Sequence, residues 1–345
     1  LATHRVHGVY AGYDYRNFGS GFDADQISFG AESLGPVWDF RANGYLLLSS
    51  ETRFVNVTNL AYVGNNLIGT ANFFDAYEGF DAEAGRNLAR AGSSFDLRVF
   101  IGGYGFFSGG SRDGWGVRGR IEATWWDRIT AGASVQHDDV FDTTVYGHVS
   151  VLFGGANRVN PCACPTVADR LGDPLHKNMH VVINRRAEEN VTILNPADSM
   201  ALEILHVDSN NLGGTMGTFE DPVDTLPANP AANFDIVLLH AGSAYNGDSI
   251  IIDDAGQRLL GDGANVPHTT PSQFGTIPLP RANDKFTQPI IHLAPDPAVT
   301  IDANDVEVAG LNISMPVGDG IFGDGVTAFN INRNMISLAG DDGVD

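Results

Sequence analysis

Residues 114–126, GWGVRGRIEATWW, alternate almost without a break between two kinds of side chain. A β-strand places successive side chains on opposite faces, so this segment predicts a strand with one apolar and one charged face. The apolar face carries Trp115, Val117, Gly119, Ile121, Ala123 and Trp125. In a water-soluble sheet that face would cover a core. In an outer-membrane barrel it would face lipid, and the charged face would line a wet lumen.

The same alternation recurs before and after this segment. The other predicted strands are 5–15, 26–34, 37–48, 95–107, 129–137 and 145–153. They are about ten residues long, which is the length of a tilted membrane-spanning strand. Under the membrane interpretation, we expect four charged side chains to face the lumen: Arg98, Arg118, Arg120 and Glu122. The alternative is a soluble antiparallel sandwich or barrel with a dry core.

Charge and hydropathy exclude some classes of function. The 345 residues suffice for two domains, and their formal net charge is −22. Residues 158–345 hold 25 acidic and nine basic side chains, so we expect no nucleic-acid partner. The chain has no run of 18 apolar residues, which predicts no membrane helix.

The alternating pattern stops at residues 155–175, where Gly, Pro and Asn dominate. This change predicts a domain at 1–155, a linker at 156–180 and a second domain at 181–345. Beyond the linker, short apolar runs at 181–183, 236–239 and 250–252 are typical of buried parallel strands.

A repeat near the end of the chain predicts a solenoid of β rungs. Val306 and Val326 are 20 residues apart, and so are Leu311 and Ile331. A period near 20 with Gly, Asn and Asp corners is typical of such a stack.

Several stretches of the first half resemble the inverse autotransporter β-domain, the outer-membrane barrel of intimins and invasins. The resemblance covers roughly residues 5–157. It rests on GYDYRNFGSGFDADQISFGAESLGPVWDFRANGYL (12–46), YEGFDAEAG (77–85), FDLRVFIGGYGFF (95–107) and GVRGRIEATWWDRITAGASVQHDDVFDTTVYGHVSVLFG (116–154). It implies an exported antiparallel barrel that precedes a displayed passenger. It also implies that residues 155–175 run back through the pore.

Two features depart from that family. Its barrel has about twelve strands, whereas eight or nine segments are predicted here. Its passengers are strings of immunoglobulin-like domains, whereas residues 204–345 resemble right-handed parallel β-helix proteins of the pectin-lyase-like type. The stretch GTFEDPVDTLPANPAANFDIVLLHAGSAY (217–245) and LLGDG (259–263) carry this second resemblance. The expected fold is therefore all-β, an antiparallel barrel followed by a right-handed parallel β-helix.

Two groups of residues are candidate metal ligands. Cys162 and Cys164, with His176 and His180 just downstream, have the donor types of a zinc site. The alternative is a linker with incidental thiols and surface histidines. Asp319 and Asp324 lie in the Gly/Asp-rich stretch GDGIFGDG, as calcium loops do, so calcium is the one possible cofactor. The alternative is solvated turns of a solenoid.

The sequence shows no nucleophile, base and orienting group in a catalytic pattern, so no reaction is expected. Basic side chains that would serve a lyase are few on the predicted solenoid: Arg258, Arg281, Lys285 and Arg333. We therefore expect a bacterial outer-membrane, cell-surface protein for display and adhesion, whose partners are membrane lipid and a surface glycan or a host or neighbour-cell protein. The alternatives are a secreted polysaccharide-acting β-helix enzyme and a structural subunit of an extracellular lattice or filament.

Overall fold

The computed structural model describes residues 5–18, 23–49, 52–91, 95–126, 128–151, 153, 170, 173, 175–177, 181–263 and 265–345. Within these residues the regular elements are all β-strands, so the predicted all-β class is confirmed. The chain divides into two compact units. Unit 1 comprises residues 1–55 and 73–186, and unit 2 comprises residues 56–72 and 187–345.

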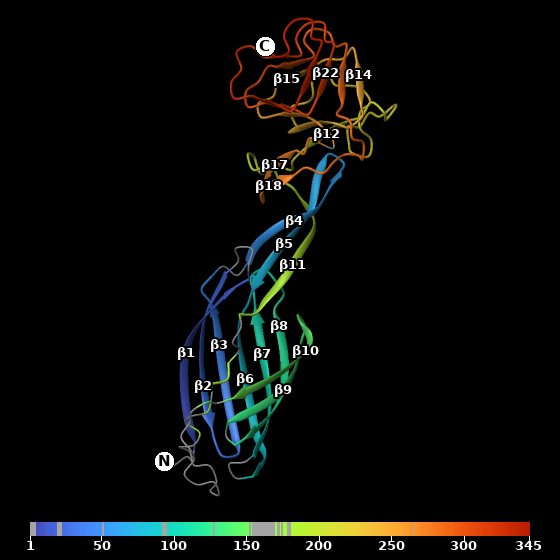
Figure 1. The fold of residues 1–345 in the computed structure, drawn as a ribbon. Helices are drawn as coiled ribbons and strands as arrows, with labels where there is room; N and C mark the ends of the chain where they lie inside the picture. Colours follow the sequence, from blue (N-terminus) through green and yellow to red (C-terminus); the bar gives the residue numbers. More distant parts are fainter. Residues whose placement is uncertain are drawn as a thin grey trace. The chain divides into compact units, whose positions relative to one another are not determined.

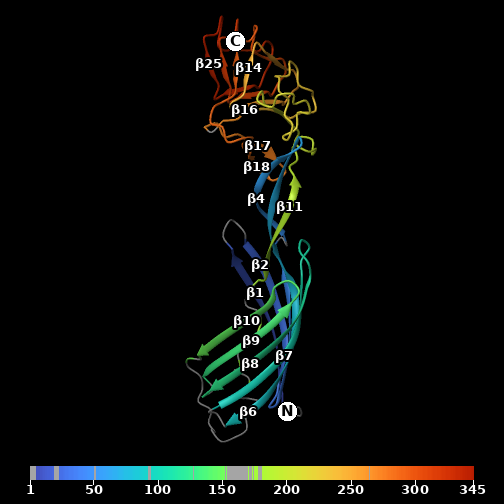
Figure 2. The ribbon, with the colours of Figure 1, turned by 90° about the vertical axis from the view of Figure 1, so that its right-hand side faces the viewer.

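Unit 1 is built on one eight-stranded antiparallel sheet, seen as a curved half-barrel (blue to green) in Figures 1 and 2. In spatial order its strands are β1 (Val6–Asn17), β2 (Asp23–Leu34), β3 (Trp38–Leu47), β6 (Glu78–Ala91), β7 (Phe95–Phe107), β8 (Gly114–Trp125), β9 (Ile129–Asp138) and β10 (Asp142–Val151). The strands predicted by alternation are all present, with small shifts at their ends. The motif at 77–85 supplies β6, which alternation alone did not predict.

The predicted closed barrel is not what the described residues form. Their strand order is open, and β1 and β10 are its two edges. The expectation is therefore confirmed for the antiparallel sheet, and the structure has a half-barrel where a barrel was predicted. Strand pattern reports which faces are apolar, but it carries no information on how many strands complete a ring.

Three further strands form a separate sheet in the order β11-β5-β4. They are β4 (Thr52–Val63), β5 (Asn66–Ala76) and β11 (Ile183–Thr192). The boundaries between the two units fall inside these strands, at 55–56, 72–73 and 186–187. The stretch 56–72 therefore belongs with unit 2, which the sequence pattern did not indicate.

Unit 2 contains three sheets of short parallel strands. The largest holds β12 (Ile204–Val207), β13 (Ile236–Leu239), β16 (Arg258–Gly261), β21 (Glu307–Ala309) and β24 (Asn330–Asn332). The second holds β14 (Ala244–Asn246), β19 (Ile290–His292), β22 (Asn312–Ser314) and β25 (Met335–Ser337). The third holds β15 (Ile250–Ile252), β20 (Val299–Ile301) and β23 (Ile321–Phe322).

From β13 onward, consecutive parallel strands belong to the first, the second and the third sheet in turn, and this order then repeats. An antiparallel hairpin, β17 (Thr269–Ser272) with β18 (Gly275–Pro278), is inserted between β16 and β19. The inward side chains of the three sheets make one apolar core, which includes Val237, Ile252, Leu259, Val299 and Ile313. Burial of these side chains from water holds the sheets together.

Two predictions about unit 2 need correction. The repeat is not 20 residues: Val308 pairs with Ile331 and Ile313 with Ile336, and hydrogen bonds between successive turns of chain join residues 23 apart. The 20-residue match was misleading because Val306, Leu311 and Val326 all lie outside the strands, so it did not connect positions that pair. In addition, Val181 lies in unit 1, where it is buried with Ala24, Phe74 and Ala76.

Candidate functional site

The two faces of the eight-stranded sheet have the opposite polarity to those of a water-soluble sheet. One face, here called the polar face, carries buried charged and amide side chains: Asp39, Arg41, Asn43, Asp81, Glu83, Arg98 and Glu122. The other, here called the apolar face, carries exposed apolar side chains: Val9, Phe29, Ile101, Trp115, Val117, Ile121, Val135, Val145 and Val149. Ile101 is 72% exposed and Arg41 only 7%. The apolar surface has been left outside.

The four charged residues predicted to share a face do share it. Arg98 pairs with Asp39, and Arg120 pairs with Glu122. The Nη2 atom of Arg118 lies 3.3 Å from Oδ1 of Asp81, on the neighbouring part of the same face. That this face lines a lumen stays a prediction.

Ion pairs join strands β2, β3, β6, β7 and β8 across the polar face. Glu83 accepts from Arg120 (Nη2 to Oε1, 2.5 Å) and from Arg41 (Nη1 to Oε1, 3.2 Å). The Arg120 guanidinium also lies 3.8 Å from the centre of the Phe100 ring. Asp81 accepts from Asn43 and from the hydroxyl of Tyr45. Such partners offset the cost of burying these charges, although Nε of Arg118 is buried without a hydrogen-bond partner among the described residues.

Antiparallel register explains why these charges meet. Arg41 lies directly opposite Glu32 on β2 and Glu83 on β6, and Arg98 lies opposite Glu122 on β8. Facing side chains in adjacent strands are close enough to interact. Opposite charges at matched positions therefore tie the strands in one register, since a slip of one residue would expose them on the other face.

Residues after the sheet lie along the polar face. Arg170 donates to the carbonyl of Gly35 and to Asp39. Farther along, Lys177 donates to Asp14 and to Ser28, and the carbonyl of His176 accepts from Asn43. At the far end the backbone nitrogen of Tyr77 donates to Val182. The described part of 170–182 thus runs from the β2–β3 turn to the opposite end of the sheet.

Aromatic side chains gather at both ends of the apolar face. Phe95 packs against Trp125, and Trp38 stacks on Phe40, at the end where β7 begins. Phe80, Phe107 and Trp115 pack together at the end where β7 finishes. Aliphatic residues such as Ile121 lie between these two groups. The apolar face therefore has an aliphatic middle and aromatic borders.

The candidate zinc ligands are not brought together by the described residues. Cys162, Cys164 and His180 lie outside them. The ring of His176 lies on the polar face, with Nε2 3.7 Å from Glu122 and Nδ1 3.4 Å from Arg120. Among the residues that the structure describes, no group of three or more His, Cys, Asp or Glu side chains could hold a metal ion.

The candidate calcium ligands lie in turns of unit 2. Oδ1 of Asp319 accepts from the backbone nitrogen of Asp342, and its own backbone nitrogen donates to Asp296. These hydrogen bonds link three successive turns of the chain, so Asp319 stabilises the stacking. Asp324 is exposed in the next turn.

A buried histidine pair in unit 2 was missed by sequence reasoning. Nδ1 of His206 lies 3.0 Å from Nε2 of His240, and Nδ1 of His240 lies 3.6 Å from Asp208. Burial lowers the pKa of His206 to about 3 and lowers that of His240 as well. Burial opposes ionisation of Asp208, but hydrogen bonds from Asn210 and Ser243 lower its pKa on balance. Tyr62, whose ring packs against His206, lies far from it in the sequence, so no local sequence pattern predicts this contact.

Comparison with family models, with curated proteins and with solved structures gives no match for this chain. Among the described residues no helix is long and apolar enough to cross a membrane.

Proposed function

We propose that the chain is an outer-membrane-anchored protein for display and adhesion at a bacterial cell surface. Unit 1 would belong to a membrane β-barrel, and unit 2 would be a displayed parallel β-helix. The observation that carries this proposal is the inverted polarity of the eight-stranded sheet. A sheet with buried ion pairs and exposed aliphatic side chains suits hydrocarbon outside and a polar interior.

The height of the apolar face fits a bilayer. Trp115 and Trp125 mark its two aromatic borders and are ten residues apart on β8. Ten residues of strand rise about 33 Å, and a tilt of about 40–45° reduces this to about 25 Å. That is the height of the apolar band of outer-membrane barrels, whose borders carry aromatic residues.

The residues along the polar face support the same proposal. In a barrel, a segment that leaves the last strand and returns through the interior would meet only polar side chains. Arg170 and Lys177 meet Asp39 and Asp14 in this way. Such a path would carry the chain towards the passenger. In lipid the edge strands β1 and β10 would each need a pairing strand, because an open edge leaves backbone groups unpaired.

Unit 2 supports the passenger role through its topology. Three parallel sheets visited in turn, with an apolar interior and polar corners, are what a parallel β-helix requires. Its surface would offer adhesive contacts to a glycan or to a protein of a host or neighbouring cell.

The test uses the fluorescence of the tryptophans, all four of which lie in unit 1. The chain is reconstituted into vesicles with and without lipids brominated on their acyl chains. Quenching by brominated lipid is expected because Trp115 and Trp38 are 58% and 44% exposed on the apolar face. In expressing cells the chain should fractionate with the outer membrane as a heat-modifiable band.

Val117→Arg places a charge on the apolar face and should reduce insertion, since a cation there costs about 2–4 kcal/mol at the bilayer midplane. The matched control is Val317→Arg, which changes an equally exposed valine of unit 2. Equal tryptophan fluorescence in vesicles with and without brominated lipid, or recovery of the chain in the culture medium, would contradict the proposed membrane anchor. The secreted enzyme and the lattice subunit would then be the functions to test.

A further inference from the structure

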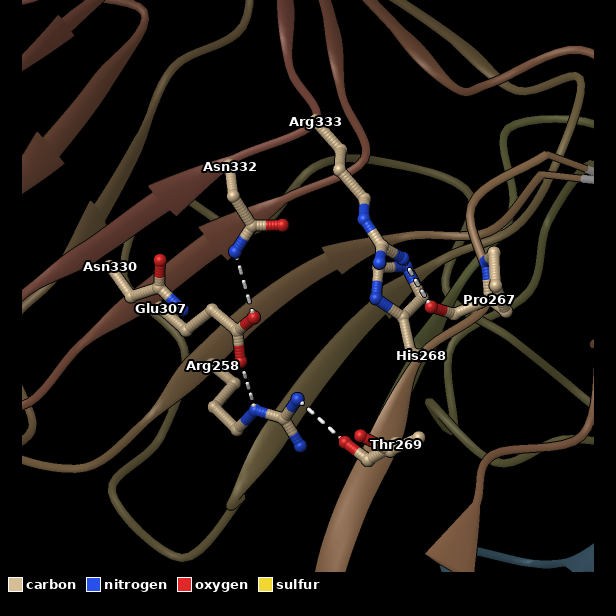
Figure 3. A pocket seen from close by; sticks show the side chains of 8 residues that line it. All are labelled: Arg258, Pro267, His268, Thr269, Glu307, Asn330, Asn332 and Arg333. Atoms are coloured by element: carbon tan, nitrogen blue, oxygen red, sulfur yellow. Dashed lines mark hydrogen bonds and ion pairs between the residues drawn. The ribbon is translucent and has the colours of Figure 1, made fainter.

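A polar pocket of about 370 Å³ lies on unit 2, over the sheet formed by β16, β21 and β24 (Figure 3). Its floor holds the first residues of these strands, Arg258, Glu307 and Asn330, which pair in register. One wall is the segment 267–269, which leads into the inserted β17–β18 hairpin. The volume is at the lower end of the range for small-molecule sites.

Two guanidinium groups line the pocket with part of their hydrogen-bonding capacity unused. Nε of Arg258 donates to Glu307 at 2.7 Å, and its Nη2 donates to the carbonyl of Thr269 at 2.9 Å. Its Nη1 is buried and has no hydrogen-bond partner among the described residues. Arg333 donates through Nη1 to the carbonyl of Pro267 at 2.6 Å (Figure 3). The buried Nη1 of Arg258 does not face the open pocket, whereas Arg333 is exposed and can donate its other N–H groups to a ligand oxygen there.

These arginines are unusual for their surroundings. Residues 56–72 and 187–345 contain only four basic side chains, Arg258, Arg281, Lys285 and Arg333, in a strongly acidic sequence. Two of the four line this one pocket. The local charge therefore favours an anion, although the protein as a whole is negative.

The remaining polar groups narrow the kind of anion. Glu307 accepts from Asn332 at 3.2 Å as well as from Arg258, so one carboxylate already shares the pocket. That negative charge disfavours a dianionic phosphate. The planar fork of arginine matches a carboxylate, and the amides of Asn330 and Asn332 and the oxygens of Glu307 can bond hydroxyl groups.

We infer that this pocket binds a small carboxylate flanked by hydroxyl groups, as in a uronic acid residue of a glycan or a free hydroxy acid. The carboxylate lies between Arg258 and Arg333, and its neighbouring hydroxyls meet Glu307 and Asn332. The inference does not depend on the membrane proposal, because all the lining residues belong to unit 2.

Isothermal titration calorimetry of the full chain tests it with four probes: sodium glucuronate, glucose, sodium lactate and inorganic phosphate. Glucuronate should bind at least about tenfold more tightly than glucose, since only the acid reaches both guanidinium groups. Lactate binding as tightly as glucuronate would identify a free hydroxy acid as the source. Weaker lactate binding would identify the sugar acid. Failure of both acids, or tighter binding of phosphate, would overturn the inference.

Arg333→Ala should weaken glucuronate binding by about tenfold or more. Arg258→Lys keeps the charge but loses the fork and should also weaken it. Arg281→Ala is the matched control outside the pocket and should leave binding unchanged. Thermal unfolding of each variant shows that unit 2 is still folded. Unchanged affinity in a folded Arg333→Ala protein contradicts the inference, whatever the result of the vesicle experiment.

Discussion

The two units of this chain bury opposite kinds of surface. Unit 1 buries Asp39, Arg41, Glu83 and Arg98 and exposes Ile101 and Val149. Unit 2 buries Ile252, Leu259 and Val308. In both units apolar side chains follow the two-residue period of a strand, but unit 1 exposes them and unit 2 buries them. Alternation therefore predicts a strand without saying which face is inside, and the identity of the surrounding solvent decides that.

The sharpest way to break this comparison is to place arginine on an apolar position in each unit. Leu259 of unit 2 is fully buried, so Leu259→Arg should cost more than about 5 kcal/mol and unfold that unit. Val117 of unit 1 is 64% exposed, so Val117→Arg should cost no more than a cation on a lipid-facing surface does, about 2–4 kcal/mol, and less than Leu259→Arg. Circular dichroism and limited proteolysis of each variant report the outcome. Similar losses in both units would mean that the apolar face of unit 1 is packed.

A second prediction concerns the ionic core of unit 1. Asp39 accepts from Arg98 and Arg170, so Asp39→Leu removes the buried carboxylate that these two guanidinium groups share and leaves them only the carboxylates of Asp96 and Asp173. The expected loss is about 3–5 kcal/mol, measured by urea unfolding in detergent. Asp113→Leu, at an exposed position, is the control and should change little. An unchanged Asp39→Leu protein would show that the polar face is solvated.

The third prediction is a pH dependence of the stability of unit 2. Because the pKa of His206 is about 3 in the folded protein and about 6.5 when unfolded, protons bind the unfolded state preferentially in this window. Stability is therefore complete above about pH 6.5 and falls as the pH decreases towards 3. The expected loss is about 3 kcal/mol between pH 7 and pH 4, and the lowered pKa of His240 adds to it.

Differential scanning calorimetry across this range follows the transition of unit 2. His206→Gln should flatten the slope, whereas His292→Gln, on β19 of the same unit, should retain it. A slope equal to the wild type in His206→Gln would assign the acid sensitivity to other groups.

The smallest expected effect is at Asp319. Asp319→Ala removes an acceptor for the backbone nitrogen of Asp342 and should cost about 1 kcal/mol, equally with calcium and with a chelator. Asp324→Ala, at the exposed neighbour, should cost less. Thermal melts decide between stacking and metal binding. A calcium-dependent gain in stability that disappears in Asp319→Ala would instead favour the calcium loop predicted from the sequence.

Local pattern predicted most of the sheet in unit 1. Strands β1, β2, β3, β7, β8, β9 and β10 follow from period-two alternation, and the shared face of Arg98, Arg118, Arg120 and Glu122 follows from the same rule. The parallel strands at 236–239 and 250–252 were also predicted, because short, wholly apolar runs fit strands buried on both faces.

The remaining features depend on distant partners. Strand β11 has the sequence INRRAEENVT, which lacks an apolar face, yet Arg186 in it donates to the buried Asp75 of β5. The sequence pattern of residues 56–72 does not distinguish them from the adjacent residues of unit 1, although Tyr62 and Leu67 pack with Ile204 and Leu238. The polar pocket of unit 2 likewise brings together residues 258, 307 and 333, which are close only because successive turns of the chain stack.

The three chain crossings between the units have a mechanical consequence. Residues 55–56, 72–73 and 186–187 each lie inside a strand, and the three strands belong to one hydrogen-bonded sheet. A pull on residues 187–345 reaches unit 1 covalently only through the 186–187 crossing, because both ends of the stretch 56–72 lead back into unit 1. The stretch 56–72 would share the load through its hydrogen bonds to Ile193 and Ile204 and through the packing of Tyr62 and Leu67. A junction of this kind resists tearing better than a single covalent tether would.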